Sequence, residues 1–174
     1  MNDDSYLYYD ELETPIGVIT VIASQKGICR VDFGRMKDIS TSCNLWGKKH
    51  FQSPEFINDQ MQVESVKRQL TEYFIGERQL FEIDLDLYGT PFQKKVWDAL
   101  YAEIPYGETR SYKEIAKSIH APKAIRAVGG AVNKNPIAII IPCHRVIGSN
   151  GSLVGYNGGI DKKEHLLRLE NAPI

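Results

Sequence analysis

The chain has 174 residues, of which 43% are hydrophobic and 25% are charged, and its formal net charge is −1. This composition is typical of a soluble globular protein with a real core, arranged as one medium domain or two small ones. The near-neutral charge excludes a protein held on nucleic acid or on an acidic membrane by its bulk field, although a local basic face remains possible.

The sequence also argues against secretion and membrane insertion. Its opening, "MNDDSYLYYDE", is acidic and lacks the apolar segment of a signal peptide. No run approaches the roughly 20 apolar residues that span a bilayer. The three cysteines are an odd number without a CxxC pair, so we expect no disulfide framework and a reducing, cytoplasmic location.

The first third of the chain predicts β structure. The segments "YLYYDELET", "GVITVIAS" and "GICRVDFG" are rich in Val, Ile, Tyr and Phe, and "TPIG" and "SQKG" separate them as turns. We expect three antiparallel strands in a meander. Residues 34–60 lose this periodicity and predict an irregular loop. Cys43 and His50 in that loop, even together with Cys29, lack the spacing of zinc ligands, so no metal site is predicted.

A helix is predicted over residues 63–74, where apolar residues form one stripe and Gly76 follows as a stop signal. We expect this helix to cover one face of the N-terminal sheet. Residues 81–87, "FEIDLDL", alternate strictly and fit either a further strand or an extended connector. The boundary near residue 88 divides the chain into an N-terminal structural α/β domain, residues 1–88, and a second domain, residues 89–174.

The second domain predicts helices with recognisable starts. Thr90 with Gln93, Ser111 with Glu114, and Asp161 with Glu164 fit capping boxes, and Pro122 fits a first helical position. The predicted helices cover residues 91–102, 111–119, 122–133 and 161–171. Only "HAP" separates the middle two, which predicts a helix-turn-helix. The fold class is therefore α+β, with a sheet-containing first domain and a mainly helical, winged-helix-like second domain.

The segment "IAIIIPCHRVIG" places a thiol and an imidazole after an apolar run. The run predicts a short buried strand that Pro142 ends. The adjacent His144 and Arg145 would favour the thiolate of Cys143, whose ordinary pKa is ~8.5. In an extended chain the thiol and imidazole point to opposite faces, so their contact requires a turn or a water relay. Glu164 and Glu170 are both candidates to orient the imidazole.

The predicted helix 122–133 carries small residues where a major-groove reader carries polar ones. A face of small residues suits close approach to a narrow groove, but it equally suits tight packing against another helix. Arg126 is the long cation among them. It fits either a surface salt bridge or a probe that enters a base stack.

These motifs together resemble one family. "IPCHRVIG", preceded by "RAVGGAVNKNP" and followed by "GYNGG", is similar to the methylated-DNA–protein-cysteine alkyltransferases, the single-use repair proteins for O6-alkylguanine. "TPFQKKVW", "IPYGETRSYKEIA" and "KEHLLRLE" extend the resemblance over roughly residues 89–170. The first 88 residues resemble the family's variable N-terminal domain in outline only.

The resemblance implies a reaction and roles for single residues. Cys143 would accept the alkyl group irreversibly, His144 would draw off the thiol proton through a water, and Glu170 would orient the histidine. Tyr112 would donate to the leaving guanine, and Asn135 would act as the hinge between the recognition helix and the cysteine segment. The base pocket would include Val132, Val146, Tyr156 and Asn157, and would need neither a cofactor nor a metal.

The resemblance also implies a partner, double-stranded DNA that carries O6-alkylguanine, with O4-alkylthymine as a further substrate. The protein would act as a monomer, flip the damaged base out through the minor groove and fill the gap with Arg126. Other residues expected to contact DNA are Arg110, Lys123, Ala127, Gly129, Gly130 and Ala131. A helix-turn-helix regulator with a structural cysteine is the alternative, and a Cys-His hydrolase is a further rival.

Overall fold

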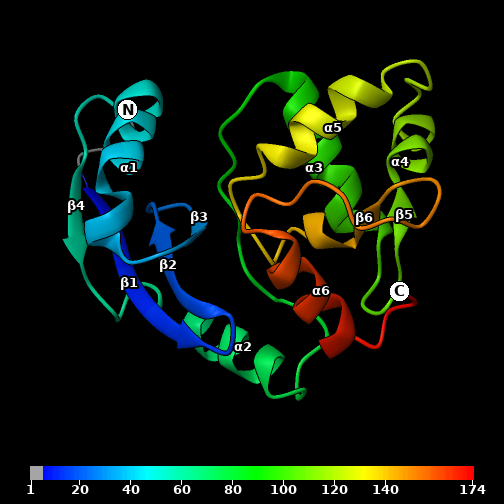
Figure 1. Ribbon diagram of the computed structural model, residues 1–174. Coiled ribbons are helices and arrows are strands. Elements are labelled where there is room, and N and C mark those ends of the chain that lie inside the picture. Colours follow the sequence, from blue (N-terminus) through cyan, green and yellow to red (C-terminus); the bar gives the residue numbers. More distant parts are fainter. Residues whose placement is uncertain (1–5) are drawn as a thin grey trace. The chain divides into compact units, whose positions relative to one another are not determined.

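The computed structural model describes residues 6–174, and the chain divides into two compact units, Met1–Tyr88 and Gly89–Ile174 (Figure 1). Each unit contains both helix and strand. Within residues 6–174, no helix is long and apolar enough to cross a membrane.

The N-terminal unit is built on a four-stranded sheet. The predicted antiparallel meander is confirmed and consists of β1 (Tyr6–Thr14), β2 (Gly17–Ala23) and β3 (Ile28–Phe33). A further strand, β4 (Glu55–Asn58), pairs parallel with β1, so that the order is β3-β2-β1-β4. The central position of β2 explains its apolar sequence, because both of its faces are covered.

The prediction of an irregular loop over residues 34–60 is wrong. These residues form α1 (Met36–His50), followed by β4. The helix buries only two of its residues fully, Cys43 and Gly47, so its sequence shows little helical periodicity. Its partly buried apolar side chains pack on a core cluster of the sheet. Tertiary packing therefore decides this element, which local pattern alone does not reveal.

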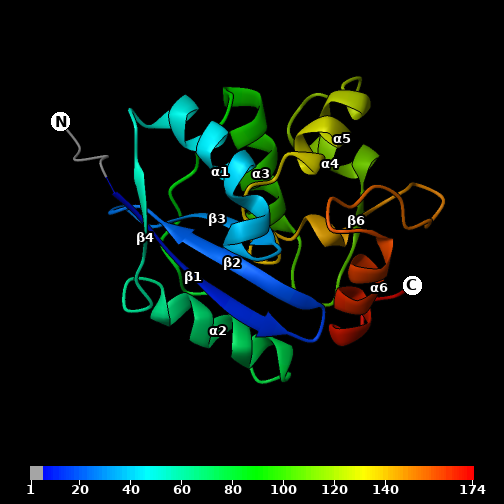
Figure 2. The ribbon, with the colours of Figure 1, turned by 60° about the vertical axis from the view of Figure 1, so that its left-hand side comes forward.

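The predicted helix over residues 63–74 is confirmed as α2 (Glu64–Phe74), and its buried residues include Val66, Leu70, Tyr73 and Phe74. Figure 2 shows α1 and α2 on opposite faces of the sheet. Of the two readings of "FEIDLDL", the extended connector holds. This segment makes only one isolated bridge, between Ile28 and Leu85.

The C-terminal unit contains the four predicted helices, α3 (Pro91–Glu103), α4 (Tyr112–Ser118), α5 (Ile125–Asn133) and α6 (Ile160–Leu169). Both halves of the Thr90–Gln93 capping box are present at the start of α3. The Ser111 side chain caps α4 by accepting from the Glu114 N–H at 3.0 Å. Helices α4 and α5 pack on each other and on α3 as the predicted helix pair.

Two predicted helix starts are wrong. Helix α5 begins at Ile125 rather than Pro122, because Ala121 and Ala124 form a further hydrogen-bonded turn before it. Helix α6 begins at Ile160 with Gly159 at the capping position, where its φ of 102° suits glycine. Asp161 therefore lies in the first turn and does not cap the helix.

The strand predicted for the apolar run before Cys143 is also absent from the described structure. Residues 137–141 are buried but coil through successive turns, and Ile139 adopts a φ of 72°. A run of apolar residues predicts burial but does not distinguish a strand from other buried conformations. Cys143 then opens a 3-10 turn, Cys143–Arg145, and the short strand β6 (Val146–Ile147) pairs parallel with β5 (Arg110–Ser111).

Gly89 is expected to be needed at the start of the C-terminal unit. A Cβ at this position would lie 2.6 Å from two ring atoms of the buried Trp97. Gly89→Ala should therefore destabilise this unit by about 1–3 kcal/mol through overpacking. Gly130→Ala is the control, because its Cβ would meet no atom within 4 Å, and on a helix it should stabilise by about 0.5–1 kcal/mol. Urea unfolding of both variants measures the difference, and equal effects would contradict the assigned clash.

Candidate functional site

Asn135 holds the buried turns that precede Cys143. Its side-chain amide donates to the Ile141 carbonyl at 2.8 Å and accepts from the Ile137 N–H at 3.0 Å. A buried segment without regular structure must find partners for its backbone polar groups, and this side chain supplies two of them. The same side chain also interacts with the Cys143 sulfur and by this interaction lowers the pKa of the thiol. Asn135 thus links the end of α5 to the cysteine segment.

The Cys143 thiol is buried, with 7% of the residue exposed. Its surroundings are polar rather than purely apolar, because the side chains of Asn135, Lys163 and Tyr156 and two backbone N–H groups interact with the sulfur. Burial nevertheless dominates and raises the pKa of Cys143 above its ordinary value. The resting side chain is therefore a thiol, and a base must remove its proton before it can act as a nucleophile.

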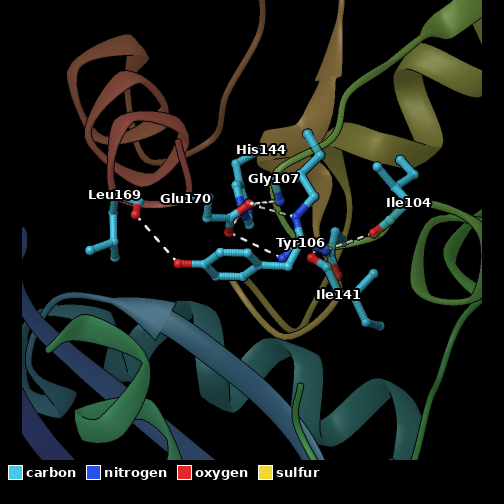
Figure 3. Close-up of polar contacts among 9 residues, drawn as sticks. Ile104, Tyr106, Gly107, Ile141, His144, Leu169 and Glu170 are labelled. Carbon is cyan, nitrogen blue, oxygen red and sulfur yellow. Dashed lines mark hydrogen bonds and ion pairs between the residues drawn. The ribbon is translucent and has the colours of Figure 1, made fainter. Parts of the chain in front are cut away.

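The carboxylate of Glu170, just after α6, joins the two residues that follow Cys143. Its Oε2 lies 2.7 Å from Nε2 of His144, and its Oε1 accepts from Nε of Arg145 at 2.8 Å. Arg145 also donates through Nη2 to Oε2 at 3.1 Å and through Nη1 to the Ile104 carbonyl at 2.7 Å. Figure 3 shows Glu170 directed at His144, with Ile104 on the far side of the cluster. Glu164, the other candidate, pairs instead with Arg168.

The protonation states of this cluster follow from its contacts. Burial by itself raises the pKa of Glu170, but hydrogen bonds and electrostatic interactions with His144 and Arg145 outweigh it and lower that pKa to about 2. Burial lowers the pKa of His144 below its ordinary value. A neutral His144 that donates from Nε2 to the ionised Glu170 leaves Nδ1 as a base. Among the described residues, Nδ1 of His144 is buried without a hydrogen-bond partner.

The expectation that His144 and Arg145 favour the thiolate is therefore wrong. The guanidinium of Arg145 is neutralised by Glu170, and His144 is held neutral by burial. The sequence indicates two positive charges next to the thiol. In the fold, the charge of Arg145 is paired with the Glu170 carboxylate, and His144 carries no charge. The chemistry that remains available to His144 is that of a base.

Acid is expected to destabilise the C-terminal unit through His144. Its pKa is lowered in the folded protein from an ordinary 6.5, so below about pH 6.5 the unfolded chain binds a proton that the folded chain does not. Stability should fall with decreasing pH by up to about 1.4 kcal/mol per pH unit. Urea unfolding between about pH 7 and 5 measures this slope. His144→Asn should flatten it, whereas His165→Asn, at an exposed histidine of α6, should leave it unchanged.

Loop 148–159, which connects β6 to α6, lies beside the thiol. The Tyr156 side chain interacts with Cys143, and the Tyr112 hydroxyl donates to the Val154 carbonyl at 3.1 Å. Burial and the nearby Cys143 raise the pKa of Tyr112, so its phenol keeps its proton. Val146 is fully buried on β6, whereas Asn157 is exposed on the loop. The structure thus brings Tyr112 and Tyr156 to the thiol.

Lys163 is the site residue that the sequence interpretation missed. It is fully buried, and its ammonium donates to the Val146 carbonyl at 2.5 Å and to the Val154 carbonyl at 2.9 Å. A signal was available, because Lys163 shares a helical stripe with the buried Leu166, Leu167 and Glu170. A lysine on the apolar face of a helix indicates a buried cation.

Helix α5 presents part of its small-residue face to solvent. Arg126, Ala127 and Gly130 are exposed. Ala131 is buried, with 3% exposed, so it does not contribute to the exposed surface expected to contact DNA. Val132, which is predicted for the base pocket, is also buried. The reading of tight packing therefore holds for the inner side of the helix, where Nε1 of Trp97 donates to the Ala131 carbonyl at 2.8 Å. Approach of the exposed side to a narrow groove stays a prediction.

A surface depression lies where α4, α5 and the exit of β6 meet, and it is lined by Tyr112, Lys113, Ile125, Gly129, Gly148 and Ser149. Tyr112 connects this depression with the thiol, since it also interacts with Cys143. Lys123 is exposed just before α5, whereas Arg110 is half-buried on β5 and pairs with Glu108 at 3.1 Å. The depression gives a solvent-facing side to a site whose sulfur is buried.

Both units match models of one protein family. Residues 91–172 match the DNA-binding domain of 6-O-methylguanine DNA methyltransferase, and residues 7–87 match the ribonuclease-like domain of the same protein. The chain is 52% identical over 165 residues to the methylated-DNA–protein-cysteine methyltransferase of Methanosarcina barkeri, covering 94% of this chain and 97% of the relative. It is 41% identical over 164 residues to the constitutive enzyme of Bacillus subtilis, covering 94% of both.

Solved structures show the same likeness. The O6-methylguanine methyltransferase of Mycobacterium tuberculosis superposes with a TM-score of 0.79 at 42% identity, covering 96% of this chain and 95% of that one. The M. tuberculosis OGT in complex with DNA gives a TM-score of 0.78 at 42% identity, covering 97% and 95%. The chain therefore belongs to the methylated-DNA–protein-cysteine methyltransferase family of DNA-repair enzymes.

Proposed function

We propose that this protein repairs duplex DNA by taking the alkyl group of an O6-alkylguanine onto the Sγ of Cys143, once per molecule. The observation that carries the proposal is the position of a neutral imidazole, fixed by an ionised carboxylate, directly after a buried cysteine. The M. tuberculosis relative in complex with DNA supports the choice of DNA as partner.

The proposed transfer begins at His144. Its Nδ1 accepts the thiol proton through a bridging water, while Nε2–H stays hydrogen-bonded to Glu170. The imidazolium that forms is stabilised by the adjacent carboxylate, as in other nucleophile–base–acid arrangements. Arg145 keeps that carboxylate ionised and fixed, so that the proton stays on the imidazole.

The thiolate then attacks the alkyl carbon. A sulfur–carbon bond forms as the bond between this carbon and the guanine oxygen breaks, and the leaving guanine carries the negative charge. Tyr112 retains its proton in the resting site and would donate it to the base. The proton held by His144 returns through water to the phenolate. The products are neutral guanine and an alkylated Cys143, whose thioether cannot return to a thiol.

The substrate base would reach the sulfur by leaving the duplex. We place α5 in the minor groove, where exposed Ala127 and Gly130 permit close approach and Arg126 replaces the everted nucleotide. Asn135 fixes the end of α5 relative to Cys143. Loop 148–159 would cover the base with Tyr156, and the backbone carbonyls near Cys143 would accept from the guanine amino group.

The proposal also holds that the protein is a monomer and acts in the cytoplasm. Its substrates would include O4-alkylthymine. Exposed lysines of the C-terminal unit would contact phosphates and make binding depend on salt. They are Lys94, Lys95, Lys113, Lys123 and Lys134.

Mass analysis of the peptide that contains Cys143 tests the proposal. Incubation with duplex DNA labelled on the O6-methyl group is expected to add one methyl group per molecule and then to stop. Cys143→Ser should gain none, whereas Cys43→Ser, at a buried cysteine of the N-terminal unit, should gain as much as the wild type. A DNA-binding regulator would retain no label, and a hydrolase would release product repeatedly without keeping the methyl group. Either result would overturn the proposal.

A further inference from the structure

Lys163 is a buried cation without a carboxylate partner among the described residues. Both of its hydrogen bonds go to backbone carbonyls, those of Val146 and Val154. Burying an ammonium group costs free energy unless its charge is compensated. Burial accordingly lowers the pKa of Lys163 from 10.5 to about 8. A buried ammonium group at this cost indicates a functional role for Lys163.

The two carbonyls belong to different parts of the site. Val146 lies on β6, directly after the turn that carries Cys143 and His144, whereas Val154 lies in loop 148–159. The Tyr112 hydroxyl donates to the same Val154 carbonyl at 3.1 Å. Lys163 therefore fixes the loop to the strand and, through one shared acceptor, helps to set the position of the Tyr112 hydroxyl.

The charge of Lys163 also acts on the thiol. Lys163 and Cys143 lie close enough to interact, and each favours the charged form of the other. The other titratable groups around the sulfur are His144, Tyr112 and Tyr156, and burial favours the neutral form of each. Arg145 and Glu170, which lie next, neutralise each other.

Resting on the function proposed above, we infer that Lys163 is a positioning residue. Its ammonium ties loop 148–159 to β6 and supplies the positive charge that stabilises the thiolate of Cys143 at the moment of attack. Its two carbonyl partners hold the charge beside the sulfur without neutralising it. This assigns to α6 the electrostatic role that the sequence had suggested for His144 and Arg145.

The pH dependence of thiol alkylation tests this inference without any DNA. The wild type and Lys163→Met are treated with iodoacetamide over a range of pH, and modification is followed by mass on the Cys143 peptide. Lys163→Met is expected to move the midpoint of the profile upward by about one pH unit, which is about a tenfold loss of rate at neutral pH. Lys162→Met, the same change at the neighbouring position of α6, should leave the profile as in the wild type.

A merely structural lysine would give a different result. Lys163→Met would then lower the melting temperature but leave the midpoint unchanged, and this would overturn the inference. If Lys163→Met does not fold, Lys163→Gln keeps a donor for one carbonyl without the charge, and the same shift is expected of it. The inference and the proposed function fail separately. A wild type that accepts no methyl group from DNA refutes the proposed function, whereas an unshifted iodoacetamide profile refutes the role of Lys163.

Discussion

Replacing Glu170 by glutamine is expected to destabilise the C-terminal unit by about 3–5 kcal/mol, because it leaves a buried guanidinium without its negative partner. Glu170 is 2% exposed and holds Arg145 through two hydrogen bonds of 2.8 and 3.1 Å. The amide of glutamine can accept only on its oxygen, so it can satisfy neither the charge nor the full geometry. Urea unfolding at neutral pH, followed by circular dichroism and tryptophan fluorescence, measures the loss.

Glu164→Gln provides the matched control. Glu164 also pairs with an arginine, Arg168, at 2.7 Å, but this is an i,i+4 pair at the surface of α6, with side chains 43% and 68% exposed. An exposed pair of this kind contributes about 0.5 kcal/mol or less. Equal losses for the two variants would show that the buried charge of Arg145 does not depend on Glu170.

A second control separates the lost ion pair from the lost volume and hydrogen bonds. In the double variant Arg145→Met/Glu170→Gln both charges are absent, so no unpaired ion remains in the interior. It should be more stable than Glu170→Gln alone, because breaking a buried pair costs more than removing it. A double variant at least as unstable as the single one would assign the cost to packing instead.

Sequence signals within a few residues correctly predict features that depend only on neighbouring residues, such as helix caps. The sequence predicts the caps of α3 at Thr90 and of α4 at Ser111 from residues three positions apart. Both halves of the capping box are present at α3, and at α4 the Ser111 side chain accepts from the Glu114 N–H. Helix α1 was missed because its stability comes from packing on the sheet, which its own pattern hardly shows. The apolar run before Cys143 predicts a strand, but the structure has buried turns there. Asn135 satisfies polar backbone groups of these turns, and periodicity does not reveal such a partner.

The same limit applies to the site. Reasoning from the residues left Glu164 and Glu170 open as partners of His144, and the resemblance favoured Glu170, which the structure places at 2.7 Å. The raised pKa of Cys143 could not be read from its neighbours in the sequence. Desolvation and the neutralisation of Arg145 depend on residues that come together only in the fold. Residues that are neighbours of Cys143 in the sequence therefore do not predict the net charge around its thiol.

Arg126→Ala is expected to slow methyl transfer from duplex DNA by about 100-fold, because extruding a base costs a few kcal/mol that a stack-filling side chain partly offsets. Arg126 is exposed on α5 and has no place among the ion pairs of the described residues, so its removal should not disturb the fold. Transfer from a free O6-alkylguanine base needs no extrusion and should keep its wild-type rate. Single-turnover rate constants on the two substrates give the ratio.

The control variant must remove a positive charge but leave the Arg126 side chain in place. Arg68→Ala does so on α2 of the N-terminal unit, where Arg68 is exposed, and it should leave both rates unchanged. If Arg126 only contacted a phosphate, its loss would instead weaken binding modestly and lower the salt dependence of affinity by about one phosphate contact. Single-stranded DNA separates these roles further, since its lesion is already unstacked. The defect of Arg126→Ala should then largely disappear, and equal losses on duplex, single strand and free base would exclude a stack-filling Arg126.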